Sequence, residues 1–156
     1  MAPTGTTSSR RHSSGLAMVE FVVVLPLCLM LLMAVGEFGH AFLQYNTLTK
    51  SLRDGARHAA HYALNGQTGV INLDAALVQE TQNLVVHQDI AGTGAAILPG
   101  FSTNDVTVTP LGSEKVTVAA SYAFQPIFGF VPAFGYGGST TTSGLVFQAA
   151  VTMRAL

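Results

Sequence analysis

The chain has 156 residues, of which 49% are hydrophobic and only 10% are charged, against about 25% charged residues in a typical soluble domain. Its net charge of −1 excludes the strong basic bias of many nucleic-acid-binding proteins, and its single cysteine, Cys28, excludes an intrachain disulfide. The length suits one domain with an extension, and the positive mean hydropathy requires a strongly apolar segment.

The first 36 residues divide into a polar leader and an apolar segment. Residues 1–15 are small, polar and basic, lack apolar periodicity, and are expected to be a disordered leader. Residues 16–36 contain a single charged residue, Glu20. A helix of that length spans about 31 Å, close to the ~30 Å hydrocarbon core of a bilayer. The segment is therefore predicted to be a transmembrane helix.

Two arginines set the predicted orientation of this helix. Arg10 and Arg11 precede it, whereas Glu37 flanks its C-terminal end. The positive-inside rule then places residues 1–15 in the cytoplasm and everything after residue 37 on the other side of the membrane.

The helix is predicted to continue beyond the membrane over residues 37–64. Apolar residues recur there every three or four positions and polar residues fill the other face, as in an amphipathic helix. No proline follows Pro26 in this run, and Asn65-Gly66 is the predicted stop. The rod over residues 16–64 would be on the order of 70 Å long. The apolar stripe comprises Phe38, Phe42, Tyr45, Leu48, Leu52, Ala56, Ala59 and Ala63, and the polar face comprises Gln44, Asn46, Lys50, Arg53, Asp54 and Arg57.

Residues 65–156 are predicted to form a small head that begins with a second helix. This helix is expected from about Leu73 to His87, with Asn72 as its candidate N-cap and Asp74 in its first turn. Residues 88–104 contain three glycines and a proline and are expected to form a loop.

The rest of the head is predicted to be a small antiparallel sheet. Asp105–Leu111 and Lys115–Phe124 alternate Val with Thr around a Gly-Ser-Glu turn, which predicts a hairpin, and Thr141–Arg154 supplies a third strand. The aromatic, glycine-rich loop at 126–139 either folds over the core or forms a subunit-docking surface. The predicted fold class is α+β, in which a long N-terminal transmembrane and amphipathic helix packs on a head with a second helix and about three antiparallel strands.

The spacing of Gly15 and Glu20 is the most informative local pattern. Glycine at the end of a helix adopts extended or turn conformations and lets a peptidase approach the backbone. Glu20 lies one turn beyond Leu16 on the same helix face. A carboxylate costs on the order of 2.5–3.5 kcal/mol at the centre of a bilayer and less near the interface, so a retained carboxylate needs a partner. The alternative is a charge that snorkels to the interface without a function.

The string SSRRHSSGLAMVEFVVVLP resembles a type IV prepilin cleavage signal, with a basic leader, Gly15, Glu20 at the fifth position after it, Phe21 and an apolar helix. The strings VEFVVVLPLCLMLLMAVGEFGHAF and LRDGARHAAHYA are similar to the TadE-like family of tight-adherence (Flp-type) pilus systems, and the final VFQAAVTMR is similar to the strand that ends many members. Major Flp pilins usually carry tyrosine after the glutamate and have little or no head, so Phe21 and the long tail favour the pseudopilin class. TadE and TadF types are not separated.

The resemblance implies a pseudopilin cut by prepilin peptidase between Gly15 and Leu16 while Arg10 and Arg11 hold the leader in the cytoplasm. It implies that Glu20 pairs with the new N-terminal amine of the same or a neighbouring subunit. The implied location is the bacterial inner membrane, crossed once, with a periplasmic C-terminal domain, and in addition an extracellular pilus. The implied partners are the peptidase, other pilins and pseudopilins, and the pilus assembly platform.

Pro26 and the glycines that follow it each leave two interpretations open. Pro26 removes one backbone hydrogen bond, and it either kinks the helix for packing and extraction or has no special role. Gly36 and Gly39 form a close-packing face for a partner helix or are flexible exit residues. Gly55 costs its helix up to ~1 kcal/mol, so a hinge or a tight packing contact is expected there.

No residue pattern predicts catalysis or a cofactor. His58 and His61 lie three residues apart, but a metal site would need a third ligand, so both are expected on the polar face. No nucleophile–base–acid set, phosphate loop or carboxylate pair stands out, and we predict no enzyme, metal site, nucleic-acid partner or small-molecule substrate.

Two other functions compete with the pseudopilin. One is an unprocessed, signal-anchored periplasmic binding or sensor module. The other is a secreted protein cut as a signal peptide near Ala34-Val35-Gly36 or Gly39-His40-Ala41, although about 20 apolar residues exceed the usual ~7–15 of such a segment. The mature N-terminus separates them, because it would be Leu16 for the pseudopilin, Met1 or Ala2 for the anchored module, and a residue near 37 to 42 for the secreted protein.

Overall fold

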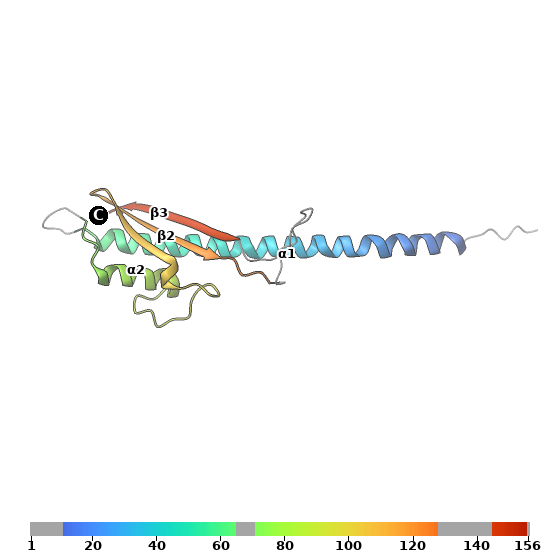
Figure 1. The fold of residues 1–156 in the computed structure, drawn as a ribbon, viewed down its shortest axis with the longest axis horizontal. Coiled ribbons are helices and arrows are strands. Elements are labelled where there is room, and N and C mark those ends of the chain that lie inside the picture. Colours follow the sequence, from blue (N-terminus) through green and yellow to red (C-terminus); the bar gives the residue numbers. More distant parts are fainter. Residues whose placement is uncertain (1–10, 65–70, 128–144, 156) are drawn as a thin grey trace, which may run out of the picture.

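The structure, a computed structural model, describes residues 11–64, 71–127 and 145–155. Its elements in chain order are α1 (Arg11–Tyr62), α2 (Ala75–His87), a 3-10 turn (Thr103–Asp105), β1 (Val106–Leu111), β2 (Lys115–Ala123) and β3 (Val146–Arg154). Figure 1 shows α1 as a long rod with α2 and the sheet gathered along its C-terminal half. The predicted α+β class, with one long helix, a second helix and three antiparallel strands, is confirmed.

The start of α1 differs from the prediction. The helix begins at Arg11 rather than at residue 16, so the expected disorder is wrong for residues 11–15. Once a helix is nucleated, each added residue gains one hydrogen bond for one ordered residue, and no proline lies between residues 11 and 16 to stop this extension. The other end is also shorter than predicted, because α1 ends at Tyr62 and the predicted stop at Asn65-Gly66 lies outside the described residues.

The sheet has the order β1-β2-β3, and both pairs of neighbouring strands are antiparallel. Gly112, with a φ of 70°, makes the turn of the predicted β1–β2 hairpin. Successive side chains of a strand point to opposite faces, and β2 accordingly buries every second residue, namely Val116, Val118, Ala120 and Tyr122, while the alternate residues are not buried.

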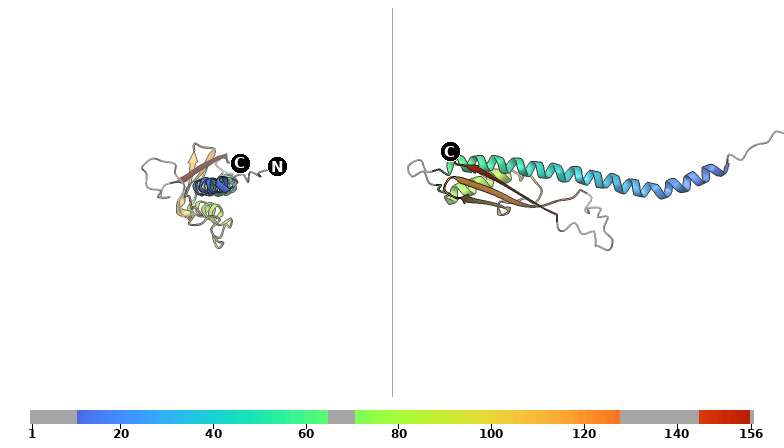
Figure 2. Two further views of the ribbon diagram at one scale, coloured as in Figure 1. Left: turned by 90° about the vertical axis from the view of Figure 1, so that its right-hand side faces the viewer. Right: turned by 90° about the horizontal axis from the view of Figure 1, so that it is seen from above.

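Both helices pack on the same face of this sheet. α1 contacts β2 and β3, and α2 contacts α1 and β1. The end-on view in Figure 2 shows the two helices side by side, with the strands running along them. Among the described residues, no element covers the other face of the sheet. From here on, the name head covers α2, the three strands and residues 44–62 of α1.

The core lies between these layers. Residues of α1 from Leu48 onward pack against Val85 and Val86 near the end of α2 and against the inner face of β2. The fully buried members include Leu48, Leu52, Ala56, Ala59, Val85, Val86, Val106, Val116 and Val118. The upper part of the predicted stripe is thereby confirmed.

The lower part of the predicted apolar stripe lies on the helix but is not buried. Phe38 and Phe42 are 74% and 65% exposed, and Tyr45 is also exposed. Conversely, Gln44, which was assigned to the polar face, is buried. The helical period alone does not say where the packing partner ends, and below Leu48 the described strands no longer cover the positions of Phe38 and Phe42.

The N-cap of α2 also differs from the prediction. Asp74, not Asn72, caps the helix, and its Oδ1 accepts a hydrogen bond of 2.7 Å from the backbone N–H of Leu77. The backbone N–H of Asn72 instead donates to the carbonyl of Ala63 at 2.8 Å, and Leu64 forms a bridge with Ile71. This closure between the two helices holds Asn72 outside α2.

Candidate functional site

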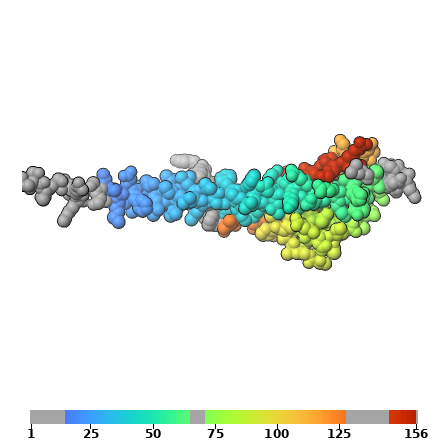
Figure 3. Space-filling model, turned by 180° about the vertical axis from the view of Figure 1, so that it is seen from behind, coloured from blue at the N-terminus to red at the C-terminus, as the bar shows by residue number. Residues whose placement is uncertain are grey.

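The N-terminal half of α1 is an apolar helix without a packing partner. Within the described residues, one helix is long and apolar enough to cross a membrane, and none of the residues in its most apolar stretch is buried. Large side chains project on all sides, with Leu16 at 74%, Val23 at 70% and Leu32 at 67% exposure. Figure 3 shows the side of α1 that faces away from the sheet, where it lies bare from end to end. A helix that is apolar all round requires lipid or other helices as its surroundings.

The residues of the predicted cleavage signal lie at the start of this bare helix. Gly15 is inside α1, and a Cβ added to it would meet nothing within 4 Å. Leu16 and Phe21 are exposed. Glu20 is exposed as well and makes no ion pair with any described residue. Because α1 is continuous here, Glu20 lies one turn from Leu16 on the same face, as the spacing predicted.

The two arginines and the proline are placed less completely. Arg10 lies outside the described residues, and Arg11 is the first residue of α1. α1 runs through Pro26 as a helix, and Figure 2 shows the N-terminal half of α1 gently curved. A kink at Pro26 stays a prediction.

Gln44 forms the junction between the bare half of α1 and the head. Its Nε2 donates to the carbonyl of Gln125 at 3.1 Å, and its Oε1 accepts from the N–H of Gln125 at 3.5 Å. The same Nε2 lies 2.7 Å from Nε2 of His40, whose ring lies 6.0 Å from that of Phe124. One side-chain amide thus binds both backbone groups of the chain leaving β2 and fixes the lower end of the head on α1.

This junction is not apparent from the sequence, because Gln44 is polar by type. Its position, however, places Gln44 on the buried face of α1, because it lies four residues before Leu48 and seven before Ser51, which are both fully buried. Glu37, seven residues before Gln44, is also buried, at 3% exposure. A polar residue in register with the buried face is therefore a candidate for a structural hydrogen bond.

Gly55 is where α2 comes closest to α1. A Cβ at Gly55 would collide with Cγ2 of Val85 and would lie 3.6 Å from the carbonyl oxygen of Thr81. The expectation of a tight contact at Gly55 is confirmed, and Ala56, Ala59, Ala60 and Ala63 extend it as buried small residues. The segment LRDGARHAAHYA is thus the part of α1 that lets α2 and the sheet approach.

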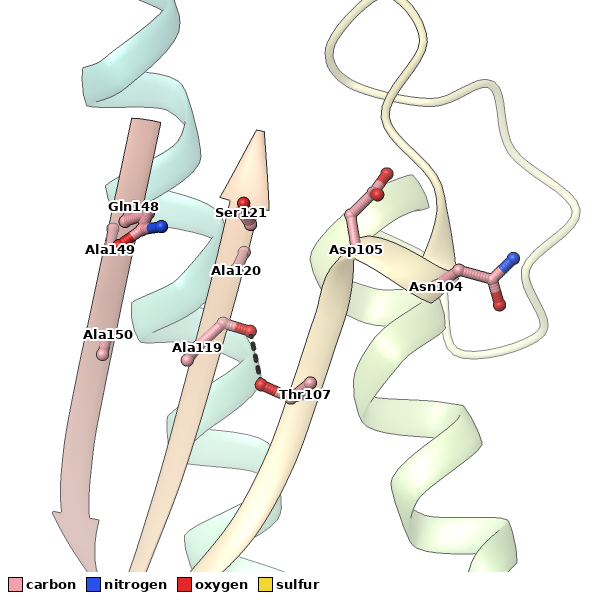
Figure 4. A pocket seen from close by; sticks show the side chains of 9 residues that line it. All are labelled: Asn104, Asp105, Thr107, Ala119, Ala120, Ser121, Gln148, Ala149 and Ala150. Atoms are coloured by element: carbon pink, nitrogen blue, oxygen red, sulfur yellow. Dashed lines mark hydrogen bonds between the residues drawn. The ribbon is translucent and has the colours of Figure 1, made fainter. Parts of the chain in front are cut away.

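The open face of the sheet carries a shallow hollow of about 490 Å³, shown in Figure 4. Alanines, Thr107, Ser121 and Gln148 supply most of its lining, and Thr107 Oγ1 donates to the carbonyl of Ala119 at 3.4 Å. Asp105 is the one ionisable group among the described lining residues. Its carboxylate already accepts bonds of 2.9 and 2.8 Å from the N–H and hydroxyl of Ser102. This arrangement offers no base paired with a nucleophile.

The remaining titratable groups do not converge on one point. Across the described ranges, no three His, Cys, Asp or Glu side chains gather closely enough to hold a metal ion. His58 and His61 instead lie against the ring of Tyr62, with ring centroids 4.9 and 4.8 Å away. In the loop after α2, hydrogen bonds from the Thr93 hydroxyl and from the N–H groups of Thr93 and Ala91 lower the pKa of Asp89, which stabilises that turn in its ionised form.

These features define a class of protein with an unpartnered, membrane-length helix that continues into a small α+β head. Residues 15–57 match the family model described as TadE-like protein. The resemblance found in the sequence is therefore confirmed over this segment. No curated protein and no solved structure matches the chain.

The matched segment covers the bare half of α1, the Gln44 junction and the Gly55 contact. It begins at Gly15, the first residue of the predicted cleavage pair. TadE-like proteins are structural proteins associated with Tad pili, and the apolar helix together with this match indicates a membrane protein associated with such a pilus. The rest of the head lies beyond the matched residues.

Proposed function

We propose that the protein is a TadE-like minor pilin or pseudopilin that takes part in the assembly of a tight-adherence pilus after prepilin peptidase cuts between Gly15 and Leu16. The observation that carries this proposal is the bare apolar helix whose family match starts at Gly15. Residues 1–15 are the cytoplasmic leader, and residues 16–36 cross the inner membrane once. Residues 37–64 extend the helix, and residues 65–156 complete the periplasmic head that packs on it.

The bare half of α1 gives the assembly step a physical basis. Before assembly, lipid surrounds its exposed side chains, and after assembly the helices of other pilins and pseudopilins take that place. Transfer from lipid to helices changes apolar burial little, so specific polar contacts have to direct it. Glu20 supplies such a contact, because cleavage would leave the positively charged amine of Leu16 one turn away.

Because Gly15 lies inside a helix, a glycine at this position would make cleavage easier. A peptidase binds its substrate in an extended form, so the first turns of α1 must unwind before cleavage. Glycine disfavours the helix by about 0.8–1.0 kcal/mol relative to alanine, and Gly15 has no side-chain contact to lose on unwinding. Gly15 is therefore the point where the helix opens at least cost.

Replacement of Gly15 tests the processing step. We expect Gly15→Leu to abolish removal of residues 1–15 in the native host, seen as a larger protein on gel electrophoresis of the membrane fraction. Gly39→Leu is the matched control, because a Cβ at Gly39 also meets nothing within 4 Å, and it should be processed normally. Normal processing of Gly15→Leu would refute the assignment of the cleavage site.

Replacement of Glu20 tests the assembly step separately. We expect Glu20→Ala and Glu20→Gln to be cut as the parent is, but to lower the number of surface pili at least tenfold. Leu32→Ala, also on the bare half of α1, is the control and should leave piliation unchanged. Normal piliation in both Glu20 variants would count against the role given to this carboxylate.

A second candidate function is an unprocessed, signal-anchored periplasmic binding or sensor module. The start of α1 at Arg11 favours it, because the cut would then have to break an existing helix. In that case the parent protein keeps Met1 or Ala2 at its N-terminus and Gly15→Leu changes nothing.

A further inference from the structure

The solvent-facing side of α1 within the head carries a row of cations. Lys50, Arg53 and Arg57 are all exposed and are spaced three and four residues apart, which puts them on one face of the helix. Within the part of the chain that the structure describes, the ion pair formed is Arg154 with Glu114 at 3.0 Å, and none of these three cations takes part in one. We call this row the basic stripe.

The basic stripe lies on the side of α1 that points away from α2. Gly55 marks the side that faces α2. Arg53 and Arg57 lie two residues before and after it, which is about 200° around a helix with 3.6 residues per turn. The stripe is therefore directed outward, and the head's own packing leaves it without an anionic partner.

The opposite side of the head carries an acidic groove. A hollow of about 380 Å³ lies where the end of α1 meets the start of α2, and its lining includes the carboxylates of Asp74 and Glu80. The Oδ1 atom of Asp74 accepts the N-cap hydrogen bond from Leu77. Its second oxygen and the whole carboxylate of Glu80 make no ion pair within the described residues. We call this hollow the acidic groove.

Most of the acidic groove lies further along α1 than the basic stripe, because its α1 lining starts at Tyr62, and Glu80 is the part of the groove that lies nearest to the level of Arg57. α2 runs antiparallel to α1, since Asn72 is bonded to Ala63 and Val85 lies against Gly55. Glu80, next to Thr81, therefore lies near the level of Gly55 and of Arg57. Neighbouring copies anchored in one membrane have parallel α1 helices, so a small shift along the axis brings the stripe of one copy to the groove of the next.

We propose that the basic stripe of one copy of this chain binds the acidic groove of a second copy. The contact is heterologous, because it joins two different surfaces. Each copy in a pair keeps one basic stripe or one acidic groove unoccupied, so repetition of the contact builds a row of subunits. It rests on the proposed function in assuming that the copies stand side by side in one membrane. Exposed ion pairs are individually weak, and they act here between subunits that the membrane already holds at high effective concentration.

Anionic lipid is a poorer partner for the basic stripe than a second copy. Lys50 lies fourteen residues beyond Gly36, the last residue of the proposed span. That is about 21 Å along an upright helix, well beyond the screening length of about 8 Å at physiological ionic strength. The acidic groove of a neighbouring copy, unlike the lipid headgroups, lies far enough from the membrane to reach the basic stripe.

Disulfide cross-linking in native membranes tests the contact. Two differently tagged full-length copies carry Cys28→Ala, one with Arg57→Cys and the other with Glu80→Cys. We expect the mixed disulfide to exceed at least tenfold that of a control pair, Arg57→Cys with Thr109→Cys, because Thr109 is exposed on the open face of the sheet. Ala76→Cys, at another exposed position of the groove, repeats the test should a change at Glu80 disturb α2.

Charge reversal tests whether the contact is electrostatic. Arg53→Glu in the copy that carries Arg57→Cys should lower the yield of mixed disulfide at least threefold. Lys115→Glu in the same copy makes an equal change of charge at an exposed site on the sheet and should leave the yield unchanged. An equal effect of the two reversals, or a yield no higher than that of the control pair, would overturn the proposal.

The size of each copy on the same gel separates this proposal from the proposed function. Cut copies without the mixed disulfide overturn the contact and leave the pseudopilin intact. Uncut copies with the mixed disulfide support the contact and overturn the processing.

Discussion

The two halves of α1 use apolar residues in opposite ways. Residues 16–36 present large side chains on every side and bury almost none of them, whereas residues 44–63 bury one face made largely of small residues. Gly55, Ala56, Ala59 and Ala63 let α2 and the sheet approach closely, so the upper half completes its own core. The bare half can be satisfied only by something outside the chain. One continuous helix thus joins a self-sufficient head to a segment that is incomplete until it meets lipid or other subunits.

The same substitution in the two halves should have very different effects on the head. Leu52→Ala removes a fully buried side chain from the core, and we expect it to lower the free energy of unfolding of the head by about 2–5 kcal/mol. Leu32→Ala, at a position that is 67% exposed, should change it by less than about 0.5 kcal/mol. Urea unfolding of the full chain in detergent, followed by near-ultraviolet circular dichroism of the tyrosines, measures both. Equal losses would remove the distinction between the halves.

Replacement of glycine by alanine should have opposite effects on the stability of the protein at Gly55 and at Gly39. Gly55→Ala forces α2 away from α1 at Val85 and should destabilise the head by about 1–3 kcal/mol. Gly39→Ala meets open space and should be neutral or favourable by up to about 1 kcal/mol, because alanine favours a helix. Addition of Val85→Ala to Gly55→Ala should recover part of the loss in the same unfolding assay. A tolerated Gly55→Ala would show that α2 packs less closely than described.

A smaller effect is expected at the far side of the core. The hydroxyl of Tyr122 donates to the carbonyl of Pro99 at 3.0 Å, and Tyr122→Phe should cost about 1 kcal/mol of unfolding free energy near neutral pH. Burial raises the pKa of Tyr122 above its ordinary value of 10.0. The contribution of the protonated hydroxyl is therefore complete below about pH 10 and is lost as the pH rises through the folded pKa.

A pH series checks this sign. The stability difference between the parent and Tyr122→Phe should stay constant from neutral pH to about pH 9 and shrink above pH 10. A difference that grows above pH 10 would contradict the assignment of the raised pKa to Tyr122.

Much of this architecture could be predicted from the sequence. The apolar run, the helical stripe from Leu48 upward and the alternation in the strands each reflect a local rule of burial. The structure has the corresponding elements, although β3 starts at Val146 instead of the predicted Thr141, and residues 141–144 lie outside the described residues. The Gly15–Glu20 spacing and the strings around it predicted the TadE-like match. Gly55 was expected to need a packing reason, since glycine inside a helix is otherwise unfavourable.

The features that could not be predicted depend on where the elements that pack on α1 begin and end. The periodicity of the sequence does not contain that information. Phe38 and Phe42 continue the stripe of Leu48 in sequence, but the described strands do not cover them. Gln44 looks like a surface residue until Gln125, 81 positions away, is placed beside it. The N-cap of α2 is Asp74 and not the predicted Asn72, because the hydrogen bond between Asn72 and Ala63 determines where the second helix can begin.

The mass of the intact protein, purified from the inner membrane of its native host, tests the central claim most directly. The account predicts a single mature form that lacks residues 1–15 and begins at Leu16. A mature form that still carries those residues would contradict it, and the molecule would then be an anchored head that no peptidase releases for assembly.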